Sequence, residues 1–117
     1  MRYVLLIYQD EQVLNESERQ QCYVDSTALA HRLQQSGNYV AANPLQSVAA
    51  ATSVRVREGK PLLTDGPFAE TREQLGGYFL IDAKDLDEAI RIAAQIPAVH
   101  SGTVEIRPVV AVPGLPE

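Results

Sequence analysis

The sequence predicts a ferredoxin-like α+β fold, in which two helices cover one face of an antiparallel sheet. The first observation is the order of segments, strand–helix–strand, hairpin, strand–helix–strand, which two βαβ units with an inserted hairpin would give. The second is that residues 2–9 and 78–81 are apolar at both parities, as in strands covered on both faces. The third is size and composition: 117 residues, 45% hydrophobic and 21% charged, suit one domain spanning residues 1–117.

The first strand–helix–strand unit is predicted to begin at residue 2. A strand over 2–9 is bounded by polar residues, and a short strand over 39–42 ends at an Asn-Pro pair. Between them, Asn15 or Ser17 can cap a helix, with Glu18 at the reciprocal position for Asn15, and a Gly-Asn pair ends it. The residues expected on the buried stripe of this helix recur at helical spacing: Cys22, Ser26, Leu29, Ala30 and Leu33.

A β-hairpin is predicted in the middle of the chain. Residues 52–57 alternate Val and Arg, which predicts valines turned inward and arginines turned outward on a half-exposed strand. A Glu-Gly-Lys turn leads to the return strand over 61–64, and an Asp-Gly-Pro loop follows. The preceding residues 45–51 are mostly small and carry no assignment.

The second strand–helix–strand unit completes the predicted sheet. A strand over 78–81 follows two glycines, and Asp85 caps the next helix with Glu88 at the capping-box position. Pro97 is expected to end that helix, and the last strand covers 103–107. The apolar residues expected along one face of the helix are Leu86, Ala89, Ile90, Ala93 and Ile96.

The apolar strands predict a homodimer. Two helices can cover only one face of the sheet, yet the strands at 2–9 and 78–81 place apolar side chains on both faces. An exposed apolar surface of that size marks an association site. Face-to-face pairing of two sheets in a symmetric dimer is the simplest way to cover it.

Charge and composition exclude several classes of protein. The net charge is -5, with ten scattered basic residues against fifteen acidic ones, which argues against nucleic-acid binding. No apolar run approaches the ~20 residues of a membrane span, and the short apolar N-terminus does not resemble a signal peptide, so a cytoplasmic location is expected. No cofactor and no metal ion are expected, because Cys22 is the only cysteine and no carboxylate–histidine cluster has ligand spacing. Cys22 itself is predicted to be a small core residue rather than a nucleophile.

The segment from residue 64 to 78 is the most informative stretch for function. It combines charged residues, Gln and three glycines in a loop that leads into a buried strand, and rigid scaffolds often carry function on such loops. Asp65 begins a tight turn there and can accept hydrogen bonds from downstream backbone amides. A purely structural turn with solvated charges is the alternative.

Segments spread over nearly the whole chain resemble the DGPF branch of the YCII-related family: residues 65–77 (DGPFAETREQLGG), 2–8, 87–89, 96–97 and 105–108. The resemblance implies the dimeric α/β-barrel fold, in agreement with the two-faced strands, but it implies no particular reaction. Some members of the branch are encoded beside, or fused to, extracytoplasmic-function sigma factors. The wider family has been suggested to use a His–Asp pair.

Two histidines are candidates for such a pair with Asp65. The wider family places a histidine in the first helix, but His31 stands about 200° around a helix from both Leu29 and Leu33 and is predicted to face solvent. His100 lies in the loop before the last strand and is the better candidate for proton transfer. Asp65, as acid, base or orienting group, and His100 are therefore the predicted catalytic residues.

The last strand carries two further candidates. Glu105 and Arg107 alternate with Val104 and Ile106, so they are predicted to face the dimer cleft while the apolar pair packs under the helices. There they can pair with each other, with Asp65, or with a bound anion, and an edge-strand ion pair is the structural alternative. The predicted ligand contacts are Arg107, Glu105, Glu70 and Tyr78.

The sequence therefore predicts a dimer that binds a small organic molecule in the cleft between the sheet and the central loop. Whether it is an enzyme stays open; proton-transfer chemistry of the isomerase or dehydrohalogenase kind rests on analogy of fold. The alternative is a non-catalytic accessory or regulatory module that works with a sigma factor. An enzyme should bury Asp65 beside a titratable partner. A module should expose an apolar patch, for which Val109–Val112 in the tail (residues 109–117, of no assigned role) is the candidate.

Overall fold

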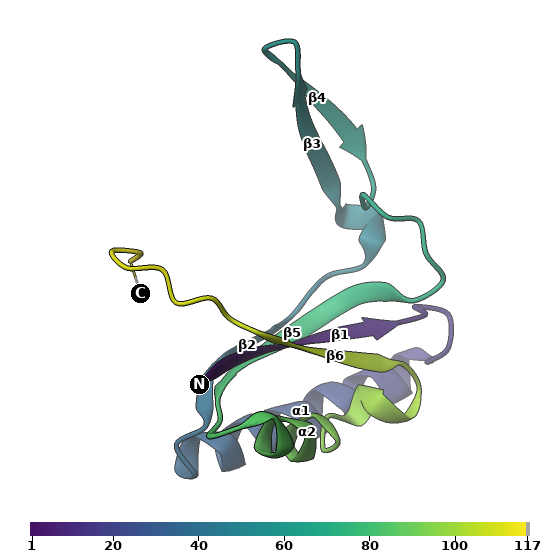
Figure 1. The fold of residues 1–117 in the computed structure, drawn as a ribbon. Helices are drawn as coiled ribbons and strands as arrows, with labels where there is room; N and C mark the ends of the chain where they lie inside the picture. The colour runs from purple at the N-terminus through teal and green to yellow at the C-terminus, as the bar shows by residue number, and fades with distance from the viewer. Residues whose placement is uncertain (117) are drawn as a thin grey trace.

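The computed structural model describes residues 1–116, in which a four-stranded sheet carries both α-helices on one face (Figure 1). The strand order is β2-β5-β1-β6, and every neighbouring pair is antiparallel. This is the predicted ferredoxin-like α+β topology, which is confirmed. The elements in chain order are β1 (Arg2–Gln9), α1 (Glu16–Gln35), β2 (Tyr39–Pro44), the short 3-10 helix η1 (Val48–Ala50), β3 (Thr52–Arg57), β4 (Lys60–Asp65), β5 (Gln74–Asp82), α2 (Leu86–Ala93), the 3-10 helix η2 (Pro97–His100) and β6 (Thr103–Pro108).

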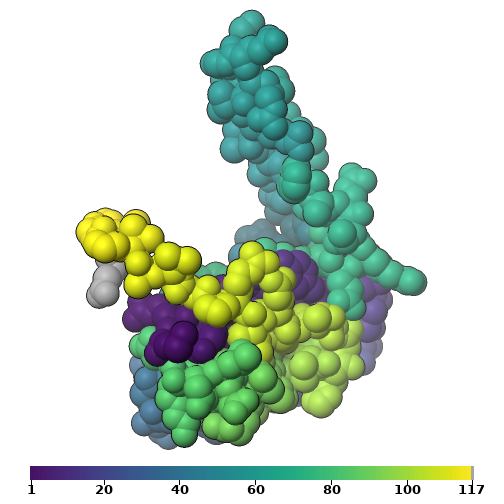
Figure 2. All heavy atoms as spheres, viewed as in Figure 1, coloured from purple at the N-terminus to yellow at the C-terminus, as the bar shows by residue number. Residues whose placement is uncertain are grey.

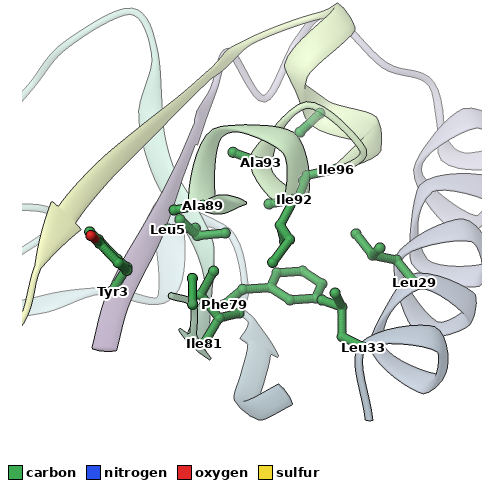
Figure 3. Close-up of a cluster of buried hydrophobic side chains, with 12 residues drawn as sticks. Tyr3, Leu5, Leu29, Leu33, Phe79, Ile81, Ala89, Ile92, Ala93 and Ile96 are labelled. Carbon is green, nitrogen blue, oxygen red and sulfur yellow. The ribbon is translucent and has the colours of Figure 1, made fainter. Parts of the chain in front are cut away.

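The core lies between the helix-covered face of the sheet and the two helices. Strand alternation sends Leu5 of β1 and Phe79 of β5 toward the helices, where both are buried. The Phe79 ring lies between Leu33 of α1 and Ile92 of α2 (Figure 3). Burying one such side chain stabilises the fold by roughly 1.5–3 kcal/mol.

The opposite side of the sheet has no helix on it, and we call it the open face. Its side chains come from alternate positions of the three strands β5, β1 and β6, and most are only half-buried. The open face consists of Val4, Leu6, Tyr8, Tyr78, Leu80, Glu105 and Arg107. The predicted apolar surface on the second face of the sheet is therefore present in the single chain.

Helix α1 begins with the predicted capping box. The Glu18 amide donates to Oδ1 of Asn15 at 2.8 Å, and the Asn15 amide donates to Oε1 of Glu18 at 3.0 Å. These bonds pair two backbone donors that a helix start otherwise leaves unsatisfied. The helix ends at Ser36, followed by Gly37 at a φ of 81°, so both predicted ends are confirmed.

Helix α2 differs from the prediction in two respects. Asp85 caps it, but the Glu88 carboxylate accepts from the Lys84 amide and the Asn38 side chain, so the reciprocal half of the predicted capping box is wrong. The helix also ends at Ala93, and Pro97 begins η2 instead of ending α2.

The buried face of α2 is rotated from the predicted one. Ala89, Ile92, Ala93 and Ile96 are buried at spacings of three and four residues, whereas Leu86 and Ile90 are about half exposed. The predicted burial of Leu86 and Ile90 is wrong. The period was right, but the sequence offers two apolar stripes on this helix, and packing on the sheet selects the one through Ile92.

Strand β5 begins at Gln74, earlier than predicted, and includes both glycines. A Cβ on Gly77 would lie 3.1 Å from the Asn43 carbonyl oxygen and 3.2 Å from Pro44 Cα. The glycine therefore lets β2 approach β5 closely, and β2 runs two residues further than predicted, to Pro44.

The hairpin of β3 and β4 forms a separate two-stranded sheet that stands away from the body (Figures 1 and 2). Glu58 and Gly59 join its strands with φ values of 52° and 75°, the conformation of a two-residue hairpin turn whose twist matches that of the strands. The predicted inward packing of its valines is wrong, because Val54 and Val56 are 63% and 60% exposed.

Candidate functional site

A cavity of about 380 Å³ lies between α1 and the β2–β5 side of the sheet, on the helix-covered face. Its lining is largely apolar and includes Ile7, Ala30, Ala42, Phe79, Ile96 and Ala98. The polar residues along it include Ser26, Thr27, His31, Gln34 and Tyr39. A concave apolar surface with a few polar groups is the usual form of a small-molecule site.

The cavity exists because small residues occupy the inner stripe of α1 near its middle. Cys22, Ser26 and Ala30 follow one another at four-residue spacing and only line the cavity, whereas Leu29 and Leu33 fill the space above the sheet further along. The prediction that this whole stripe is buried holds for the two leucines; Cys22, Ser26 and Ala30 are half-buried. On the sheet side, the glycines of β5 contribute no side chain to fill the gap.

His31 lies on the lining of the cavity although the residue is exposed. The prediction that it faces solvent is therefore right about its exposure, and the structure adds that the residue borders the cavity. An imidazole at this position can donate or accept a hydrogen bond from a bound molecule and can exchange a proton with it.

Cys22 borders the same cavity with its thiol held in the protonated form. Burial raises the pKa of the Cys22 thiol above its ordinary value, and the carboxylates of Asp25 and Glu18 raise it further by disfavouring a thiolate. A protonated thiol is a poor nucleophile, so this arrangement does not activate Cys22.

A second, more polar cavity of about 700 Å³ adjoins the first and shares Cys22 and Tyr23 with it. Its charged side chains already have partners. The Glu11 carboxylate accepts from Ser47 Oγ at 2.7 Å and from the Val48 amide at 2.9 Å, and Arg19 pairs with Glu16 at 3.0 Å. The Glu11 bonds hold η1 against the loop that follows β1. Because the charged groups of the second cavity are already paired, the apolar cavity is the better candidate site.

The structure brings three of the predicted ligand contacts to the open face. Tyr78, Leu6 and Glu105 stand in one cross-strand row, and the Asn43 amide nitrogen donates to Tyr78 Oη at 3.0 Å. Two strand spacings place the backbones of Tyr78 and Glu105 about 10 Å apart.

Glu105 and Arg107 form an ion pair on that face, as the sequence allowed. Arg107 donates through Nε at 2.9 Å and also through Nη2 to the same Glu105 Oε2. The hydrogen bond that Arg107 donates to the Glu105 carboxylate raises the pKa of Arg107 above its already high ordinary value, so Arg107 stays cationic. An anion bound at Arg107 would compete with the Glu105 carboxylate.

The remaining predicted residues lie elsewhere in the chain and do not meet. Asp65 ends β4 on the hairpin, Glu70 lies in the loop after it, and His100 ends η2; all three are exposed. Within residues 1–116 none of their side chains makes a hydrogen bond or an ion pair with another group.

The turn after Asp65 is held without its carboxylate. The Gly66 amide donates to the Ala51 carbonyl at 2.7 Å, and Ser53 Oγ donates to the Gly66 carbonyl at 2.8 Å. The expected bonds from backbone amides to the Asp65 side chain are therefore not part of this turn, and the prediction of that role is wrong.

The cavity was missed from the sequence, although a signal for it exists. Small residues recur at positions 22, 26 and 30, and small residues also stand at 42, 76 and 77 on the strands they face. A stripe of small side chains opposite glycine and alanine leaves unfilled space when the backbones are held apart by larger neighbours.

Residues 1–116 contain no group of three or more His, Cys, Asp or Glu side chains that is placed to share a metal ion. No helix in that range has the length and apolar character to span a membrane.

Comparison with known proteins finds two matches. The family model of the YCII-related domain matches residues 1–113. An uncharacterised protein of Rhizobium meliloti (strain 1021) is 34% identical over 113 residues, which cover 92% of this chain and 91% of that protein. The matched region includes the helix, strands and glycines that form the cavity.

Proposed function

Since the chain belongs to the YCII-related domain family, we propose that it works as a homodimer that binds a small organic molecule in the cavity beneath α1. The observation that carries this proposal is the cavity itself. Its volume of about 380 Å³ falls in the range typical of ligand pockets, roughly 300–1,000 Å³.

The lining favours a small, mainly apolar ligand with one polar end. Phe79, Ile96 and Ile7 offer apolar contact at the sheet side, while Ser26, His31 and other polar groups offer hydrogen bonds. A compact aromatic or alicyclic compound with a hydroxyl, carbonyl or carboxyl group matches this distribution.

Proton transfer is the chemistry that these residues support. His31 is the imidazole on the cavity lining, and it can move a proton to or from a polar group of the ligand. Asp65 and His100, predicted as the catalytic pair, do not border this cavity. Their role stays a proposal that requires a second site, outside this cavity.

The open face supports the homodimer part of the proposal. Val4, Leu6 and Leu80 present apolar side chains that no helix covers, and a second copy of the same face would bury them. Tyr78, Glu105 and Arg107 would then line a cleft between the two sheets. We propose that they contact a bound ligand there.

A titration with 4-nitrophenol, followed by NMR of the Ala30 and Ala42 methyl groups, tests the cavity. Saturable shifts of both methyls are expected, because both line the cavity. Ser26→Trp should abolish the shifts by filling the space, whereas Val24→Trp, on the exposed side of α1, should leave them unchanged. If neither 4-nitrophenol nor a panel of small phenols, aromatic acids and amides shifts these methyls, the ligand proposal is wrong.

An accessory module is a second candidate function, because part of the expected apolar patch is present. In the tail, Val109, Val110 and Val112 are all exposed, and Asp65 is not desolvated as an enzyme would require. Binding of a purified extracytoplasmic-function sigma factor, lost on Val110→Asp, would favour the module over the enzyme.

A further inference from the structure

We propose that the hairpin of β3 and β4 is an arm that clasps a second copy of this chain through one apolar face. The inference rests on the homodimer proposed above and goes beyond it, since it assigns the hairpin rather than the open face. The arm face consists of Val54, Val56, Pro61 and Leu63.

The cross-strand register places these four residues on the same side of the hairpin. Val54 pairs with Leu63 and Val56 pairs with Pro61, while the alternate pairs are Ser53 with Thr64 and Arg55 with Leu62. Directly paired residues share a face, and successive pairs along the hairpin point to opposite faces. The hairpin therefore has one continuous apolar face and one mixed, basic face.

The protomer leaves the arm face uncovered. Val54, Val56 and Leu63 are 63%, 60% and 72% exposed. The other face does meet the chain, because the Arg55 guanidinium lies 4.8 Å from the centroid of the Phe68 ring. A two-stranded hairpin without a packed face is marginally stable in water, so an ordered arm of this kind requires a surface to lie against.

The direction of the arm brings a second copy within its reach. The hairpin rises on the side of the sheet away from the helices, which is the side of the open face (Figure 1). Figure 2 shows the arm clear of the body along its length. Sheets packed face to face lie about 10 Å apart, and six residues per strand give the arm a length of about 20 Å. The arm is therefore long enough to reach past the sheet of a partner seated on the open face.

Charge favours an acidic occupant for the arm, and the body of a second copy meets that condition. Residues 52–65 hold three basic and two acidic side chains, a net charge of +1, so the remainder of a chain with total charge -5 carries -6. The arm is therefore the positive part of an otherwise acidic molecule, and its complement is the body of another copy.

Neighbouring leucines on opposite faces of β4 provide a matched test. In sedimentation equilibrium, Leu63→Asp should raise the dimer dissociation constant by at least about tenfold, the loss expected from one buried apolar anchor. Leu62→Asp introduces the same charge one residue away, on the mixed face, and should change it by less than about threefold. Equal effects of the two variants, or no effect of Leu63→Asp, would contradict the proposal that the arm face contacts a second copy.

Hydrogen exchange of the wild-type chain gives an independent readout. Backbone amides of β3 and β4 should exchange slowly at concentrations where the dimer forms and rapidly after dilution to monomer, because only the partner stabilises the hairpin. Equal protection in both states contradicts the inference, as does a dimer whose hairpin stays unprotected, which would point to a different protein as the occupant.

These outcomes separate the arm from the proposed function. A chain that sediments as a monomer at every concentration refutes the dimer and the arm together. A stable dimer insensitive to Leu63→Asp refutes the arm alone, and binding of 4-nitrophenol in the cavity beneath α1 is expected to persist in both leucine variants.

Discussion

The body and the hairpin of this protein are built from equally regular strands but differ in what covers their apolar side chains. In the body, Leu5 and Ile81 are fully buried between the sheet and the helices. In the hairpin, Val54 and Leu63 pair across strands with the same alternation and stay mostly exposed. A regular element with an uncovered apolar face indicates a contact that a single chain does not supply.

The largest expected effect tests how tightly the body is packed. A Cβ at Gly102 would lie 2.2 Å from the Tyr8 carbonyl oxygen, so Gly102→Ala forces two backbone segments apart. We expect a loss of about 4 kcal/mol in the free energy of unfolding, measured by denaturant titration.

Gly76→Ala is the control for that substitution. Its nearest atom would be the Ile7 carbonyl oxygen at 3.9 Å, an ordinary contact, and a change of less than about 1 kcal/mol is expected. Equal losses at the two glycines would show that close packing at Gly102 is not the cause.

The same substitution in each region measures the difference between them directly. Leu29→Ala removes a fully buried side chain of α1 and should cost about 2–5 kcal/mol. Leu63→Ala removes an exposed one and should cost less than about 0.5 kcal/mol at concentrations where the chain is monomeric. A loss of several kcal/mol from Leu63→Ala in the monomer would mean that the hairpin packs on its own chain.

The reactivity of Cys22 tests the environment of its thiol at the edge of the cavity in the body. Because burial and two carboxylates raise its pKa, less thiolate is present at a given pH, and iodoacetamide should alkylate Cys22 at pH 7.5 at least about threefold more slowly than free cysteine. The rate should climb with pH up to that raised pKa, and Asp25→Asn should increase the rate at pH 7.5. A rate equal to or above that of free cysteine contradicts this environment.

The smallest effect is expected at Asp65. Its carboxylate is exposed and unbonded within residues 1–116, so Asp65→Asn should change the free energy of unfolding by less than about 0.5 kcal/mol. Binding of 4-nitrophenol beneath α1 should also be unchanged. If that substitution abolished binding in the cavity, Asp65 would have to reach it in the dimer, and the two regions would form one site.

Local signals in the sequence predicted most element boundaries. The capping pair Asn15 and Glu18 located the start of α1, and the Gly-Asn pair located its end, because both act through bonds within a few residues. The turn at Glu58 and Gly59 located the hairpin for the same reason.

Errors arose where two solutions satisfied the same local pattern. Helix α2 has apolar stripes through both Ile90 and Ile92, and only contact with the sheet decides which is buried. Glu88 was expected to complete a capping box, but Asn38, fifty residues away in the chain, competes for its carboxylate.

The candidate site was harder to predict than the fold. Glu105 and Arg107 were correctly placed on one face by strand parity, which needs only the two-residue period, and the structure adds Tyr78 to that face. The position of Asp65 relative to them could not be predicted, because the hairpin that carries Asp65 forms a sheet of its own.

The sequence by itself determined the order, type and approximate ends of the helices and strands, and through them the ferredoxin-like topology, because these depend on hydrophobic periodicity and on caps and turns of short range. Only the tertiary structure decided which side chains meet. It opened the cavity beneath α1, separated Asp65 from Glu105 and Arg107, and turned the hairpin away from its own body. Those outcomes depend on distances between elements far apart in the chain, and such distances follow from packing the whole molecule rather than from any local pattern.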